Sequence, residues 1–203
     1  MTRYALVKDG AILEFREGAP NLDQTKLAAG KPRLLPVVVE DQPEYDPAKQ
    51  ALSGPTHVVE ATRVVERYTV TNKTLAERKA QMMREVSNLR DAKLTAGYAH
   101  DFGPEGIHLL QTRDADDKLN WLTSQAAYSA AVAQGAGAMM GATFRSADNE
   151  TFTVSLADGL AALLAMAAWG KAIYGRSWAL KDDIEAAATH AALDAVDIDV
   201  GWV

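Results

Sequence analysis

The chain has 203 residues, of which 48% are apolar and 24% are charged, and its formal net charge is −6 at pH 7. This length can form one large domain or two small ones, and the composition is that of a globular protein, neither disordered nor membrane-embedded. The acidic balance argues against a general nucleic-acid binder, which carries a basic excess. The absence of cysteine excludes disulfides, thiolate metal sites and cysteine nucleophiles.

The first 72 residues are expected to be β-rich and extended. Residues 4–7 and 11–15 flank Asp9-Gly10, and an Asp-Gly pair between two apolar runs predicts a β-hairpin. Valines at 37–39 and between 58 and 70 supply the remaining strands.

Proline is concentrated in this N-terminal part. Six of the seven prolines fall between Pro20 and Pro55. Because proline fixes φ and removes a backbone donor, we expect loops and edge strands here rather than a compact layer.

A helix is predicted to follow, from Thr74 to about Leu94. Thr74 and Glu77 have the spacing of a capping box, in which each side chain bonds the other residue's backbone N–H. Apolar residues then recur at helical spacing and form one stripe, which consists of Leu75, Met82, Val86 and Leu89. Such a stripe must pack on something, either the following domain or copies of itself in a short coiled coil.

A second hairpin and a second helix are expected next. Residues 98–102 and 107–112 flank a Gly-Pro-Glu-Gly turn, which predicts two short strands. Acidic residues at 114–117 suit the N-terminus of a helix, where negative charge is favourable. The predicted buried stripe of this helix consists of Leu119, Leu122, Ala126, Ala130 and Ala133.

A glycine-rich segment, residues 135–141, is predicted to end that helix. It resembles a dinucleotide fingerprint but has the wrong spacing and follows a helix, not a strand. A third hairpin is predicted over 142–154, with Asp148-Asn149 at its turn.

The C-terminal third is expected to hold two helices and a tail. Ser155 caps a helix that is apolar nearly all round and therefore central. Its longest apolar stretch, residues 160–169, is half the length of a membrane span, so no span is expected. Another helix is predicted near 180–191, and residues 198–202 alternate as a final extended piece.

These elements predict an α+β fold in three parts. The parts are a β-rich, proline-containing N-terminal module (residues 1–72), a connecting helix (73–95), and a helical C-terminal domain with short antiparallel hairpins (96–203).

No constellation of residues predicts chemistry. A metal site needs ligands that converge, and among the four histidines only His100 and His108 can face each other across a hairpin, with Asp101 close. We therefore predict no catalytic, cofactor-binding or metal residues, and no enzyme activity. Aromatic residues at helical spacing are expected in the core, with sugar binding as the alternative; they are Trp121, Tyr128, Trp169, Tyr174, Trp178 and Trp202.

The order of elements in the C-terminal part is distinctive. Its most recognisable pieces are residues 106–112, Asn120-Trp121-Leu122, the hairpin 145–154 and the tail 197–202. Over residues 75–203 the chain resembles the C-terminal domain of unknown function of bacteriophage tail-fibre and tail-assembly proteins. None of these motifs is chemical, so the resemblance implies a setting and no site.

The resemblance implies a non-enzymatic structural component of a phage tail, at the tail tip, baseplate or fibre attachment. One alternative is a tail-fibre assembly chaperone that is absent from the mature virion, and another is an enzyme or binding module that acts on host surface glycans. The expected partners are other tail proteins and copies of the chain itself, as a trimer or in the symmetry of the tail. Nucleic acid, a membrane span and cofactors are not expected, and the expected location is the virion tail after synthesis in the host cytoplasm.

Overall fold

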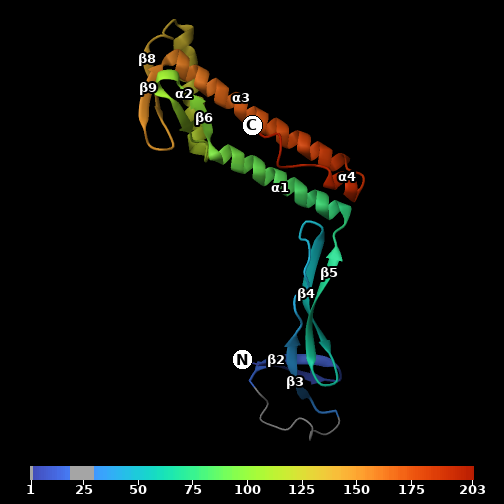
Figure 1. Ribbon diagram of the computed structural model, residues 1–203. Coiled ribbons are helices and arrows are strands. Elements are labelled where there is room, and N and C mark those ends of the chain that lie inside the picture. The colour runs from blue at the N-terminus through green and yellow to red at the C-terminus, as the bar shows by residue number, and fades with distance from the viewer. Residues whose placement is uncertain (1, 19–29) are drawn as a thin grey trace. The chain divides into compact units, whose positions relative to one another are not determined.

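The computed structural model describes residues 2–18 and 30–203 and has a mixed α+β fold, which confirms the predicted class (Figure 1). The chain divides into two compact units, residues 1–78 and 79–203. The division falls inside the helix α1 (Leu75–Ala96), so most of this helix belongs to the second unit. The proposed boundaries at residues 72 and 95 stay a prediction.

The first unit is built on a five-stranded sheet, in the order β2-β1-β3-β5-β4. Its N-terminal hairpin has the predicted turn, because Asp9 and Gly10 both have positive φ, 52° and 78°, as a two-residue hairpin turn requires. The strands are β1 (Arg3–Lys8), β2 (Ala11–Glu17), β3 (Arg33–Val39), β4 (Gln50–Val59) and β5 (Val64–Asn72).

Most of the described prolines lie in loops or on an edge strand, as expected, and Pro36 is the exception. Pro55 is indeed on an edge strand, at a register shift in β4, but Pro36 lies in the central strand β3. β3 pairs with β1 up to Pro36 and with β5 from Val37 onward. Because Pro36 stands where both ladders end, its missing N–H interrupts neither. Pro20 is outside the described residues.

The core of the first unit is small and includes one paired charge. Ala5, Val7 and Val64 form its buried apolar cluster. Glu66 beside them is only 7% exposed, and its carboxylate accepts a hydrogen bond from Arg3 at 3.0 Å. Burial of this carboxylate is tolerated because it has that partner.

Helix α1 begins as predicted. The Glu77 backbone N–H donates to the Thr74 hydroxyl at 3.2 Å, and the Thr74 backbone N–H donates to the Glu77 carboxylate at 2.8 Å. The capping box is therefore formed. The helix ends at Ala96, before Gly97, whose φ of 93° suits only glycine.

In the second unit two short antiparallel hairpins pack with helices, as predicted. A single 3-10 turn, Gly103–Glu105, joins the strands of the first hairpin. The elements after α1 are β6 (Tyr98–Asp101), β7 (Ile107–Leu110), α2 (Ala115–Ala133), β8 (Met140–Arg145), β9 (Thr151–Ser155), α3 (Leu156–Ala186) and α4 (His190–Asp194). Figure 1 shows α1 alongside α3, and the two helices touch where the Lys79 ammonium donates to the Glu185 carbonyl at 2.6 Å.

Helix α3 corrects the prediction of two C-terminal helices. It runs unbroken for 31 residues, through Gly170 and Gly175, and only the short α4 follows it. No proline occurs after Pro104, and isolated glycines weaken a helix without ending it. By length and composition alone α3 could cross a membrane, but helices of soluble proteins pass the same test, so the expected absence of a span stays a prediction.

The C-terminal tail is not the extended piece that alternation predicts. Residues 196–203 form bends without a strand. The Trp202 indole donates to the Ile198 carbonyl at 2.8 Å, and the Arg176 guanidinium donates to the Val200 carbonyl at 3.1 Å. The alternating residues of the tail therefore lie in local turns that are bonded to α3, and not in a strand.

The core of the second unit lies where both hairpins meet α2 and α3. Aromatic rings dominate it: Phe144 packs 5.1 Å from Phe102 and 5.7 Å from Phe152, centroid to centroid. Trp121 is 9% exposed, which agrees with its predicted place in the core, whereas Trp178 is 60% exposed and disagrees. All four tryptophans of the chain belong to this unit: Trp121, Trp169, Trp178 and Trp202.

Candidate functional site

The predicted self-association stripe on α1 is partly covered within the chain. Val86 is completely buried, whereas Leu75, Met82 and Leu89 are half-buried. The structure therefore leaves three of these four side chains with some surface for a partner. Association through this stripe stays a prediction.

The predicted buried stripe of α2 lies on the surface, which is a correction. Leu119 and Leu122 are 61% and 62% exposed, and the three alanines of the stripe are exposed as well. The opposite face of the helix is the one packed on the core, through Trp121 and partly through Tyr128. The large aromatic side chains fill more of the core than Leu and Ala do, so they decide which face turns inward.

The exposed face of α2 is uncharged from Leu119 onward, whereas its first turn carries the exposed Asp116 and Lys118. We use the name α2 stripe for Leu119, Leu122, Ala126, Ala130 and Ala133. The sequence holds no charged residue from 119 to 144, although the chain as a whole carries a net charge of −6. A solvated helix face is normally rich in charged residues, so this stripe has the character of an interface.

A shallow apolar hollow of about 220 Å³ adjoins the α2 stripe, between α2 and α3. Leu122 belongs to both the stripe and the hollow. The largest apolar side chains that line it are Leu94, Trp121, Leu122, Leu163, Met166 and Trp169. The stripe and hollow together offer a partner both a flat face and a recess.

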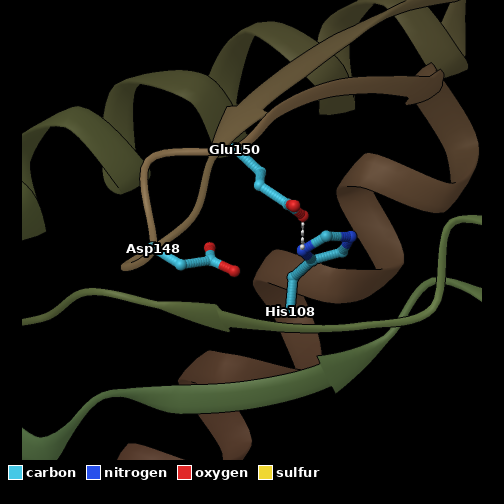
Figure 2. Close-up of side chains that lie close together, drawn as sticks. All are labelled: His108, Asp148 and Glu150. Atoms are coloured by element: carbon cyan, nitrogen blue, oxygen red, sulfur yellow. Dashed lines mark ion pairs between the residues drawn. The ribbon is translucent and has the colours of Figure 1, made fainter.

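A cluster of three side chains forms the second candidate site (Figure 2). His108 comes from β7, and Asp148 and Glu150 come from the turn between β8 and β9. One ligand atom from each of the three lies within 4.8 Å of the others. His108 is only 9% exposed, while both acids are exposed.

The imidazole of His108 is held in place from two sides. Its Nε2 lies 2.8 Å from the Glu105 carbonyl oxygen, and its ring stacks on Phe152 with centroids 4.1 Å apart. Its Nδ1 faces the acids and lies 3.8 Å from the Glu150 carboxylate. Position and orientation of the ring are therefore fixed before any ligand arrives.

The turn that carries the two acids is also fixed. The Ala147 backbone N–H donates to the Leu109 carbonyl of β7 at 2.9 Å. The Ser146 hydroxyl donates to the Asp148 carboxylate, and this bond lowers the pKa of Asp148 below its usual value. Asn149 takes a positive φ of 67°, which asparagine tolerates in turns.

This cluster differs from the pairing considered in the sequence. His100 and His108 are register partners in the β6–β7 hairpin, but the Nδ1 of His100 lies 3.2 Å from the Tyr98 hydroxyl instead. The acids near His108 come from a segment about 40 residues further on. No local spacing signals that approach, and Asp148 was visible only as a turn residue.

The acidic run at the start of α2 has the structural role that the sequence predicts. The Asp114 carboxylate accepts from the Asp117 backbone N–H at 2.9 Å and so caps the helix. The Arg113 guanidinium donates to Asp117 at 3.1 Å and lowers the pKa of that carboxyl.

Comparison with known proteins identifies a family but no function. The profile of a family described as "Domain of unknown function (DUF4376)" matches residues 77–199, more than half of the chain. No curated protein and no solved structure matches the chain.

Proposed function

This chain belongs to the DUF4376 family of domains of unknown function, and on that premise we propose that it is a non-enzymatic structural component of a bacteriophage tail. Its work is protein–protein docking at the tail tip, the baseplate or the fibre attachment. The phage setting rests on the resemblance of residues 75–203 to tail-fibre and tail-assembly proteins. The docking role rests on the surface of the second unit.

The α2 stripe is the observation that carries the docking role. Its five apolar residues repeat along one face of the helix, and all are exposed. Covering one leucine side chain stabilises an interface by roughly 1.5–3 kcal/mol at most. Leaving Leu119 and Leu122 in water is therefore a cost that a partner removes.

The proposed occupant of the α2 stripe is the same stripe on a second copy. A chain of net charge −6 repels its copies over most of its surface. The uncharged stripe is where two copies can approach without that repulsion. Its alanines also allow two helix backbones to come close, which leucines alone would prevent.

We therefore propose that the main contact lies on α2 rather than on the α1 stripe. Val86, at the centre of the α1 stripe, is already buried inside its own chain, so α1 has less free apolar surface to offer. Copies joined through α2 are compatible with a trimer or with the symmetry of a tail.

Light scattering on the full chain at high concentration tests the proposal. We expect the wild-type protein to be oligomeric and Leu122→Glu to be monomeric, because the variant places a charge in the uncharged face. Leu122 is 62% exposed, so the variant should fold. The matched control is Leu13→Glu in β2 of the first unit, where the leucine is 56% exposed, and we expect it to remain oligomeric.

The comparison of Leu122→Glu with Met82→Glu decides between the two helices. Dissociation by Met82→Glu alone would move the interface to the α1 stripe and reject the α2 stripe. A wild-type chain that is monomeric at all concentrations would reject self-docking altogether.

Mass spectrometry of purified virions tests the phage setting separately. A structural component must be found in the particle in a fixed copy number. A chain that is needed for assembly but missing from the particle would instead be a tail-fibre assembly chaperone.

A further inference from the structure

We propose that His108, Asp148 and Glu150 bind one divalent transition-metal cation, with zinc as the best match. The site is separate from the α2 stripe and independent of the proposed docking function. It would join the β8–β9 turn to strand β7, and so cross-link the two hairpins of the second unit. The sequence had predicted no metal site.

The hydrogen bond of His108 determines which of its ring nitrogens is available to a metal. The Glu105 carbonyl oxygen can only accept, so the Nε2 that lies 2.8 Å away must carry the proton. In the neutral imidazole the lone pair is then on Nδ1. Metal-binding histidines use this arrangement, in which the second ring nitrogen donates to a carbonyl or carboxylate and fixes the ring.

The groups around Nδ1 of His108 are suited to a cation. Nδ1 and the carboxylates of Asp148 and Glu150 converge from three positions, and all three are acceptors. The Glu150 carboxylate lies 3.8 Å from Nδ1. Three converging acceptors repel one another unless a cation lies among them.

The distances suit a cation after a small movement. Zinc bonds to imidazole nitrogen and carboxylate oxygen are about 2.0–2.2 Å long, so ligand atoms around it lie roughly 3–3.5 Å apart by geometry. The present spacing is at most 4.8 Å. Both acids are exposed and can close this gap by side-chain rotation, while the nearly buried His108 stays fixed.

The ligand types select the metal. An imidazole nitrogen suits zinc and other transition metals, whereas calcium and magnesium require oxygen ligands throughout. Three protein ligands leave a fourth tetrahedral position for water. Because the acids are exposed, the site is open to solvent on that side.

Calorimetric titration of the full chain with zinc chloride, after removal of metal by chelation, tests the proposal. We expect about one zinc ion per chain and no measurable binding of magnesium. Asp148→Asn and Glu150→Gln, both at exposed positions, should each weaken zinc binding at least about tenfold. Cobalt provides a second readout, because a four-coordinate site gives a visible absorption band that the double variant should lose.

The control is His100→Gln, on the neighbouring strand β6, which we expect to bind zinc as the wild type does. Absence of zinc binding would overturn the proposal. Binding that survives in the Asp148→Asn, Glu150→Gln double variant would also overturn it, because the metal would then lie elsewhere. Far-UV circular dichroism of each variant shows that loss of binding is not loss of folding.

Discussion

Gly159 lies where α3 crosses strand β8 at close range. A Cβ atom at this position would stand 2.3 Å from the Cβ of Ala142, which is itself completely buried. Real side chains never approach so closely, so helix and strand would have to separate. Glycine is required here by packing and not by backbone conformation.

We therefore expect Gly159→Ala to destabilise the protein by about 1–3 kcal/mol, as overpacked cores do, in spite of the better helix propensity of alanine. Gly175→Ala, in the same helix, meets no described atom within 4 Å and should instead stabilise by up to about 1 kcal/mol. Urea denaturation of both variants measures the difference. Equal effects at the two positions would show that helix propensity, and not the contact with β8, sets the outcome.

The role of a single residue could be predicted from the sequence where its partner is only a few residues away. Thr74 with Glu77 and Asp114 with Asp117 are three residues apart, and both cap a helix as expected. Gly159 was not identified, because Ala142 approaches it through the fold. The candidate metal cluster was missed for the same reason.

At the scale of the element, the start of α1 depends on pH. Hydrogen bonds from the backbone N–H of Thr74, and next from its hydroxyl, lower the pKa of Glu77 below its ordinary value of 4.5. Because the pKa of Glu77 is lower in the folded state, the carboxylate stabilises the fold fully at any pH above its pKa in the unfolded state. This stabilisation is lost as the pH falls through the folded value.

Denaturation of the wild type and of Glu77→Gln at several pH values tests this. The two should differ in stability at neutral pH, and the difference should disappear as the pH falls below 4.5 and Glu77 takes up a proton. The other carboxyl groups are common to both proteins and cancel in the comparison. A difference that persists unchanged at low pH would mean that the carboxylate charge does not hold the cap.

The sequence predicted most helices and strands correctly, but it predicted the buried face of α2 and the length of α3 wrongly. Apolar spacing predicted a helix at α2 but chose the wrong face, because that face and the aromatic face both repeat at helical intervals. Pro36 argued against a central strand, but β3 changes partner at that residue. The predicted separate helix near 180–191 divided α3, which runs unbroken from Leu156 to Ala186.

At the scale of the whole molecule, the two units are expected to fold separately. Lys73 lies between β5 and α1, outside regular structure, and the boundary between the compact units follows closely at residue 78. Limited trypsin digestion should therefore cut first near Lys73 and release a stable C-terminal fragment. Connections between compact units are the usual sites of such cleavage, and Lys73 is half-buried there.

N-terminal sequencing of the fragment locates the cut, and Lys73→Gln should slow its appearance. Uniform resistance from about residue 70 to 98 would count against two separately folding units. Cleavage that begins within β8, β9 or α3 would show that the second unit is not stable by itself.

The placement of the tryptophans gives the second unit an intrinsic fluorescence signal that the first unit lacks. All four lie after residue 120, so the indole emission of the intact chain originates there, and the five-stranded sheet of the first unit contributes none. Fluorescence therefore follows the melting of one unit while far-UV ellipticity follows both. Comparison of the two transitions on the unmodified chain therefore shows whether its two units unfold in one step or in two.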